Sequence, residues 1–206
     1  MTSLIGRLHA RAVFGRRVQV LAANIASLVP RDARVVDVGC GDGSIAARLL
    51  QLRPDIDLVG IDVFVRPRTH VPVVLSDGDT IPYDDAAFDV ALLVDMLHHT
   101  QNPTLLLKEA ARVSPGTVII KDHLADGFLA RPTLRLMDWV GNAHLGVALP
   151  YIYWTEARWR EAFADAGLVP DVWRTELGLY PRPAAWVFER GLHVLCRAAI
   201  ERHPNA

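Results

Sequence analysis

The chain has 206 residues, of which 51% are hydrophobic. This length and composition are typical of one globular domain that needs neither a disulfide nor a metal ion to fold. Its 22 basic and 23 acidic side chains give a formal net charge of -1. That balance argues against a protein whose main partner is nucleic acid. We therefore expect a single domain over residues 1–206.

The two cysteines, Cys40 and Cys196, form no CxxC pair and show no zinc-ligand spacing. We expect both to be free, buried thiols in a reducing compartment, which favours the cytoplasm. No run of 18 apolar residues is present, and scattered arginines interrupt any signal-peptide core. The sequence thus predicts no transmembrane segment, and it leaves the oligomeric state open.

Residues 1–30 are expected to form an amino-terminal helical segment. Apolar side chains recur at helical spacing between Val18 and Leu28. We expect a helix over Leu4–Leu28 that breaks near Gly15. The arginines in its first half indicate a solvated basic face or, as an alternative, a weak peripheral contact with anionic lipid.

Strands and helices alternate along the rest of the chain. The predicted strands are Ala33–Val38, Leu58–Asp62, Val71–Ser76, Phe88–Val94, Gly116–Asp122, Val169–Thr175 and Leu192–Ala198. The predicted helices are Ser44–Arg53, a helix from Pro103 to about Val113 capped by Asn102, and a helix capped by Thr155 that stops at Gly167. This alternation predicts an α/β fold with a doubly wound parallel sheet, and the last two strands are expected to form a hairpin with a long loop.

The segment 124–153 differs from its surroundings because it is rich in aromatic and methionine side chains. We expect it to be a helical insertion that covers a bound substrate as a lid. Trp139, Tyr151 and Tyr153 are then candidates to line an apolar substrate pocket. The alternative is that these aromatic side chains belong to the core.

A glycine-rich turn follows the first strand, in the sequence Asp37-Val38-Gly39-Cys40-Gly41-Asp42-Gly43. Gly39, Gly41 and Gly43 allow a tight turn and a close approach of the backbone to a ligand. The helix that follows offers free N–H groups to an anion. Dinucleotide-binding enzymes use the same device, so the turn alone does not separate cofactors.

Two carboxylates, Asp62 and Asp37, indicate which cofactor the glycine turn binds. Asp62 ends the second strand, where a carboxylate can accept both hydroxyls of a ribose. Asp37 precedes the first glycine, where its charge would repel a pyrophosphate but attract the ammonium group of a methionine moiety. The pattern therefore favours S-adenosylmethionine, although a nicotinamide-dependent oxidoreductase is the alternative enzyme class.

Two further segments carry a resemblance. Ser76–Asp89 and Val94–His99 resemble the regions around the third and fourth strands of class I S-adenosylmethionine-dependent methyltransferases. The chain is similar to their small-molecule branch, which includes quinone and sterol methyltransferases. The match covers Val35 to about Lys121, with a weaker match to the C-terminal hairpin. It implies a Rossmann-like, mostly parallel sheet of seven strands, with the last strand antiparallel.

The resemblance also implies roles for cofactor-binding residues. Asp37 and the glycine turn, including Cys40, would hold the methionyl part, and Asp62 with Val63 would hold the ribose and the adenine face. Asp77 would accept from the adenine amino group, and the Gly78 backbone would meet the ring. Gly78 stands where the family more often has alanine. Val94 and Asp95 would lie near the methionyl end.

The acceptor site is expected at the carboxyl ends of the strands. His98, His99, Asp122 and His123 lie there, and we take His99, Asp122 and His123 as candidate catalytic residues. A general base is needed only if the acceptor carries a proton, and no metal is expected, although these groups would permit one. We expect the acceptor to be a small, lipophilic or aromatic molecule. A non-catalytic adenosylmethionine-binding module remains the alternative outside enzymes.

Overall fold

A computed structural model describes residues 4–142 and 150–200, without the side chains of residues 4–14, 141 and 142. The strands are β1 (Arg34–Val38), β2 (Asp57–Asp62), β3 (Val73–Leu75), β4 (Val90–Val94), β5 (Val118–His123), β6 (Leu168–Arg174) and β7 (His193–Ile200). The helices are α1 (Leu4–Ala26), α2 (Ser44–Leu52), the 3-10 turn η1 (Leu97–His99), α3 (Pro103–Val113), α4 (Ala130–Asn142), α5 (Glu156–Asp165) and α6 (Ala185–Phe188).

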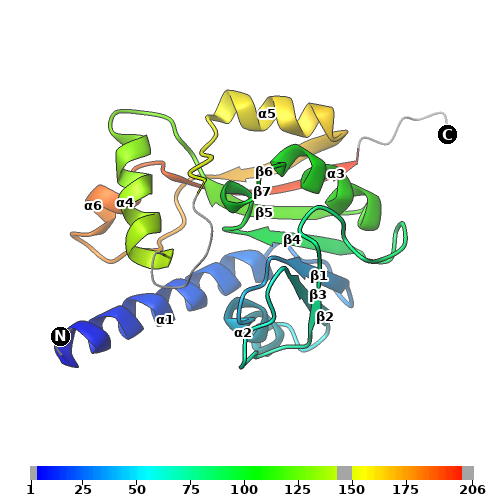
Figure 1. The fold of residues 1–206 in the computed structure, drawn as a ribbon, viewed down its shortest axis with the longest axis horizontal. Helices are drawn as coiled ribbons and strands as arrows, with labels where there is room; N and C mark the ends of the chain where they lie inside the picture. Colours follow the sequence, from blue (N-terminus) through cyan, green and yellow to red (C-terminus); the bar gives the residue numbers. More distant parts are fainter. Residues whose placement is uncertain (1–3, 143–149, 201–206) are drawn as a thin grey trace.

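The strands form one sheet in the order β3-β2-β1-β4-β5-β7-β6 (Figure 1). β1 pairs in parallel with β2 and β4, and β4 pairs in parallel with β5. β7 is antiparallel to both β5 and β6. The predicted seven-stranded, mostly parallel sheet and its C-terminal hairpin are therefore confirmed. The strand order reverses between β1 and β4, and ligands of such sheets bind in the crevice at that switch point.

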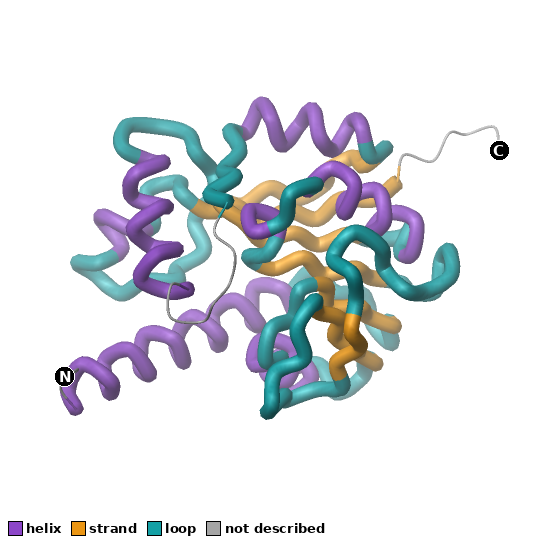
Figure 2. The backbone as a smooth tube through the Cα atoms, viewed as in Figure 1, coloured by secondary structure: helices purple, strands orange, loops and turns teal. Residues whose placement is uncertain are grey.

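Helices cover both faces of the sheet (Figure 2). Alternate residues of each strand face opposite sides. One buried cluster joins Val36, Leu93 and Ile120 to α3 and α5, while the other joins Val35, Leu92 and Ile119 to α1 and α2. A strand buried on both faces reads as a continuous apolar run. This is why the central strands were predictable from the sequence.

The amino-terminal helix α1 is continuous through Gly15, so the predicted break is wrong. A single glycine in a helix costs only about 0.5–1 kcal/mol relative to alanine. The burial of Leu21 and Ile25 against the sheet outweighs that cost. No helix in residues 4–142 and 150–200 has the length and hydropathy needed to cross a bilayer.

The segment 124–153 is helical only over α4, and residues 143–149 lie outside the described part of the chain. Residues 150–155 form an irregular connection to α5 rather than a helix, with a left-handed φ of +55° at Tyr151. Ala130, Leu134, Tyr153 and Leu192 make a small buried cluster of their own. Figure 1 places α4 and α6 beyond the carboxyl ends of β4 and β5. Whether this segment acts as a lid stays a prediction.

Two leucines of α3 should differ in their contribution to stability, because Leu107 is fully buried and Leu105 is 45% exposed. Leu107→Ala is expected to lower the free energy of unfolding by about 2–5 kcal/mol because it leaves a cavity. Leu105→Ala, on the same helix, is expected to change it by less than about 0.5 kcal/mol. Urea denaturation of the two variants measures the difference. Equal losses would contradict the packing described for α3.

Candidate active site

The glycine-rich turn connects β1 to α2 in a left-handed backbone conformation. Gly39, Gly41 and Gly43 have φ angles of +70°, +62° and +76°. A Cβ atom at Gly43 would lie 2.6 Å from Val71 Cγ2, whereas one at Gly41 would meet only the Arg66 guanidinium, at 3.8 Å. Gly43 is therefore required by packing, and Gly41 leaves the turn open beside the strand ends.

Cys40 lies within this turn, and its thiol packs against Gly60 on β2. The side chain is half-buried, and burial raises the pKa of its thiol to about 12. Cys196 is fully buried, and burial raises its pKa to about 12 as well. Both cysteines are free, as predicted, and neither is a reactive thiolate at neutral pH.

Asp62, at the end of β2, is held by two backbone donors. Its Oδ2 accepts from Gly41 N–H at 2.8 Å, and its Oδ1 accepts from Phe64 N–H at 3.0 Å. Each carboxylate oxygen has a second acceptor position, so two positions remain for a pair of vicinal hydroxyls. This geometry fits the predicted contact with a ribose beside the glycine turn.

Asp37 lies on β1 and is only 3% exposed. Burial, and then the negative charge of Asp62, raise the pKa of Asp37 from 3.8 to about 7. Within residues 4–142 and 150–200, no ion pair or hydrogen bond engages its carboxylate. A buried carboxylate without a partner is costly, and an ammonium group bound beside it would remove that cost. The residues present therefore fit the methionyl end of S-adenosylmethionine.

The predicted adenine-binding residues lie beyond β2 and β3. Asp77 Oδ1 accepts from the backbone N–H groups of Thr80 and Asp79. These hydrogen bonds lower the pKa of Asp77, and the bond from Thr80 has the larger effect. Gly78 has a φ of +91°, and a Cβ there would lie 2.8 Å from Val63 Cγ1. Glycine therefore suits this position better than the alanine more common in the resembling family, and Val63 and Gly78 together offer an apolar edge.

Val94 and Asp95 stand at the end of β4, the other side of the switch point. Val94 is buried, and Asp95 has a left-handed φ of +52°. The Asp95 carboxylate forms ion pairs with Arg17 of α1 and Lys121 of β5. Burial opposes ionisation, but Arg17 and then Lys121 hold the pKa of Asp95 well below its usual range. Asp95 thus ties three elements together at this edge of the sheet.

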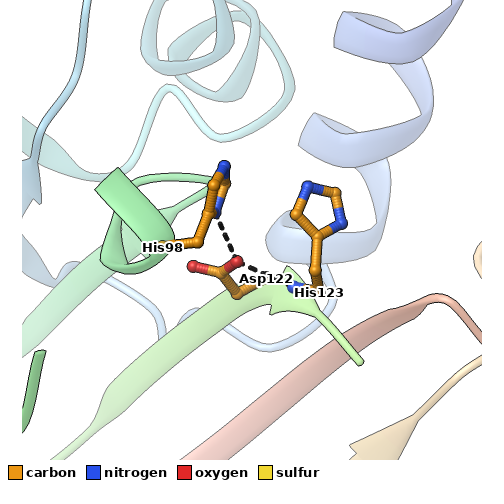
Figure 3. Close-up of side chains that lie close together, drawn as sticks. All are labelled: His98, Asp122 and His123. Carbon is orange, nitrogen blue, oxygen red and sulfur yellow. Dashed lines mark hydrogen bonds and ion pairs between the residues drawn. The ribbon is translucent and has the colours of Figure 1, made fainter. Parts of the chain in front are cut away.

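The end of β5 divides its polar side chains between the two faces of the sheet. Lys121 Nζ contacts Asp95 on the α1 side and lies 3.3 Å from His193 Nδ1. Asp122 points the other way, and its Oδ1 lies 2.6 Å from His98 Nδ1 (Figure 3). His123, the last residue of β5, lies on the same side as Lys121, with its Nε2 3.9 Å from Asp95 Oδ1, but at the strand end it also reaches His98. Its ring lies 4.6 Å from that of His98, centroid to centroid.

His98 and His123 differ in protonation. Burial lowers the pKa of His98, but Asp122 and then Asp138 outweigh it and raise the pKa to about 10. Burial, and then the charge of His98, hold the pKa of His123 well below 6.5. His123 Nδ1 is buried without a hydrogen-bond partner. At neutral pH His98 is therefore a cation and His123 is neutral.

The predicted catalytic and substrate residues are only partly brought together. Asp122 and His123, with His98, border a narrow seam that Ile152 and Trp154 close and that admits no water molecule. Tyr153 is buried, and its hydroxyl donates to Asp138. The ring centroid of Tyr151 lies 6.3 Å from that of Tyr153. Trp139 is 59% exposed and does not line this seam. His99 lies beside His98, with ring centroids 4.0 Å apart.

Sequence reasoning missed the basic partners and Asp138. Lys121 interrupts an otherwise apolar strand, which is a readable signal, because a lysine at such a position needs an acidic partner. Asp138 stands on the apolar stretch of α4 and gives a weaker signal of the same kind. Arg17 gives none, since its partner Asp95 is 78 residues away.

The profile of a family described as a methyltransferase domain matches residues 9–171. The chain belongs to this family. It is an S-adenosylmethionine-dependent methyltransferase domain, with the glycine turn, Asp37 and Asp62 at the switch point of its sheet. S-adenosylmethionine supplies an electrophilic methyl group on a sulfonium ion. The predicted enzyme class and cofactor are therefore confirmed.

Relatives share about half of this domain. It is 30% identical over 112 residues to the 27-O-demethylrifamycin SV methyltransferase of Amycolatopsis mediterranei, and the aligned region covers 47% of this chain and 41% of the relative. It is 31% identical over 117 residues to the phthiotriol/phenolphthiotriol dimycocerosates methyltransferase 1 of Mycobacterium ulcerans, which covers 52% and 41%. The chain therefore spans less than half the length of these two relatives.

Solved structures share the fold at low identity. The 1,6-didemethyltoxoflavin-N1-methyltransferase of Burkholderia thailandensis has a TM-score of 0.64 at 20% identity, covering 94% of this chain and 83% of that chain. An S-adenosylmethionine-dependent methyltransferase from Mesorhizobium loti has a TM-score of 0.62 at 19% identity, covering 84% and 94%. At this identity the likeness establishes the fold.

The protonation of Asp37 predicts how cofactor affinity depends on pH. Only ionised Asp37 attracts the cofactor ammonium group, so the dissociation constant for S-adenosylmethionine should rise as the pH falls below about 7. The limiting slope is about tenfold per pH unit, as for any single group that must lose a proton. Calorimetric titrations between pH 5.5 and 7.5 measure it.

Asp37→Asn is the matched variant for this prediction. It should bind the cofactor weakly at every pH, without the slope. It should also melt at a higher temperature than the wild type at pH 8. Because the pKa of Asp37 is raised from 3.8 to about 7 in the folded state, stability falls as the pH rises between these values, and asparagine, which cannot ionise, removes that penalty. A wild-type affinity that is flat from pH 5.5 to 7.5 would refute the role of Asp37.

Asp62 gives a second prediction. Asp62→Ala should weaken S-adenosylmethionine binding by at least about tenfold, because charge-assisted hydrogen bonds are worth roughly 1.5–3 kcal/mol each. Asp57→Ala, an exposed position at the other end of β2, is the control and should bind normally. Equal affinities for a folded Asp62→Ala protein and the wild type would place the ribose elsewhere.

Proposed function

We propose that this domain transfers a methyl group from S-adenosylmethionine to a small, lipophilic or aromatic molecule bound where β4 and β5 end. The observation that carries the proposal is the unpaired, buried Asp37 beside the open glycine turn. It prepares a cation-binding position that a nicotinamide dinucleotide, with its anionic pyrophosphate, would not use. Methyl transfer is an in-line displacement, so alignment and exclusion of water are the enzyme's main tasks.

The acceptor would lie beside Asp122, His123 and His99. Asp122 and His123 border the seam at the end of β5, and the apolar side chains of Leu97, Ile152, Trp154 and Trp159 complete it. The seam is closed, so an acceptor enters only if residues 150–154 move. That requirement supports the role proposed for 124–153 as a lid. A mostly apolar wall with few polar groups favours a lipophilic acceptor.

Two relatives support this acceptor class by their names, one acting on a rifamycin and the other on phthiotriol and phenolphthiotriol lipids. Membership in the quinone and sterol branch is a finer proposal that rests on Ser76–Asp89 and Val94–His99 alone. A non-catalytic adenosylmethionine-binding module is the alternative. It would bind the cofactor with the same side chains and never turn it over.

Turnover decides between the two. The protein is incubated with S-adenosylmethionine carrying a labelled methyl group and a panel of lipophilic phenols, carboxylic acids and quinones, and the products are identified by mass spectrometry. Methylation of one acceptor class, lost in the Asp37→Asn protein, is the expected result. Tight cofactor binding with no transfer to any member would favour the binding module.

Tyr151 tests the acceptor pocket. Its ring is half-buried beneath Arg135 in the segment proposed as a lid. Tyr151→Ala should lower kcat/KM for the acceptor by roughly tenfold or more, since burying such a ring is worth about 1.5–3 kcal/mol. Phe128→Ala, at an 85% exposed position in the same segment, is the control. If Tyr151→Ala instead lowers melting temperature and cofactor affinity together, Tyr151 belongs to the core.

A further inference from the structure

Five side chains meet where η1, β5 and α4 converge, and we call them the His–Asp cluster: His98, His99, Asp122, His123 and Asp138. Ligand atoms of His98, His99 and Asp138 all lie within 4.8 Å of one another, and so do those of His98, Asp122 and His123. We propose that this cluster binds one divalent transition-metal ion. Its ligands would be His98, His99 and Asp138, with His123 as a fourth donor.

The spacing of the donor atoms fits such an ion. His98 Nε2 and His123 Nε2 lie 3.5 Å and 3.8 Å from the same oxygen, Oδ1 of Asp138. Both distances are longer than the 2.7–3.2 Å typical of N–H···O hydrogen bonds. Two ligands bound at about 2.0–2.1 Å to a tetrahedral ion stand roughly 3.3 Å apart. The cluster therefore needs only small side-chain shifts to close around a metal.

A second layer of hydrogen bonds orients these ligands. Asp122 accepts from His98 at Nδ1 (Figure 3). Nε2 of His98 faces Asp138, and a bound metal ion would replace the Nε2 proton. Asp122 itself is fixed by the backbone N–H groups of Leu97, at 3.1 Å, and His123, at 2.7 Å. Carboxylate–histidine–metal arrangements of this kind set the tautomer and raise the basicity of the ligand.

Asp138 is oriented from the other side. The Tyr153 hydroxyl donates to Oδ2 of Asp138, so Oδ1 is the oxygen that faces the two histidines. His98, Asp138 and His123 are each 5% exposed or less. Trp154, Trp159 and Leu97 pack around the seam beside them. A shell of this kind excludes water and strengthens metal binding.

The ligand types select the ion. Imidazole nitrogens with a carboxylate suit Zn²⁺, Fe²⁺, Co²⁺ or Ni²⁺, whereas Mg²⁺ and Ca²⁺ prefer sites made of oxygen. The ion would stand at the end of β5, beside the acceptor seam, where it could hold an acceptor oxygen. That role rests on the proposed function, whereas metal binding itself does not.

The test uses the tag-free, full-length protein, stripped with a chelator and titrated with Zn²⁺ by calorimetry. We expect one ion per chain, and Co²⁺ should give the visible absorption of a four- or five-coordinate site. His98→Ala and Asp138→Ala should weaken binding at least 100-fold. Asp122→Asn should weaken it 10- to 100-fold, the usual effect of an outer-layer change. His70→Ala, at an exposed position far from the cluster in sequence, is the control.

Absence of saturable one-to-one binding of Zn²⁺ and Co²⁺ to the wild-type protein overturns the proposal. So does unchanged affinity in Asp138→Asn, which keeps the shape of the side chain and guards against loss of folding in the alanine variants. Cofactor affinity and methyl transfer are each measured twice, on the metal-free protein and on the Zn²⁺-loaded protein. Metal binding without transfer would sink the proposed function and leave the site intact, and transfer without metal binding would do the reverse.

Discussion

The carboxyl edge of the sheet depends on the partly buried ion pairs of Asp95 with Arg17 and Lys121. Three carboxylates, those of Asp95, Asp122 and Asp138, share this edge with Arg17, Lys121 and His98. Burying any one of these charges alone would cost several kcal/mol, and together they offset one another. Arg17 comes from α1, Asp95 from the end of β4 and Lys121 from β5. The same contacts that neutralise the charges therefore fix how α1 docks on the sheet.

Asp37 shows the opposite arrangement only a few residues from the switch point. Its carboxylate is as buried as Asp138, yet the described residues provide it with no cation. Its pKa rises to about 7 where that of Asp95 falls. A carboxylate already paired within the protein has little left to offer a ligand, whereas Asp37 can still pair with a bound cation. The cofactor site that we propose is thus the place where the fold leaves a charge unbalanced, at a cost to stability.

The sequence was sufficient for the sheet because its signals are local. Runs such as Val90–Val94 are apolar throughout, as expected for strands buried on both faces, and the glycine turn marks where β1 ends. The continuity of α1 through Gly15 was not predictable, since tertiary burial of Leu21 and Ile25 overrides the local penalty. The composition of segment 124–153 marked it as different from its surroundings, but could not separate helix α4 from the irregular residues 150–153.

The sequence could predict that the proposed cofactor residues gather at one edge of the sheet, because each lies at or near the end of a strand and parallel strands bring their ends together. Their contacts with the cofactor stay a prediction. The pairing of Lys121 with Asp95 depended on the order β4-β5, which links residues 26 apart. The exposure of Trp139 depended on how α4 is rotated, and composition holds no information on that. The aromatic side chains of segment 124–153 suggested an acceptor pocket, whereas in the structure Tyr153 is buried and Trp139 is exposed.

Asp138 connects the segment proposed as a lid to the reacting end of the sheet. It lies on α4, receives the Tyr153 hydroxyl, and faces His98 and His123. The cluster beneath α4 is small, so separating it from the sheet costs less than opening the main core. Tyr153 follows Ile152, which closes the seam proposed for the acceptor. If residues 150–154 move in the way proposed for a lid, Tyr153 would draw on Asp138 through their hydrogen bond, and acceptor entry would be coupled to the geometry of the His–Asp cluster.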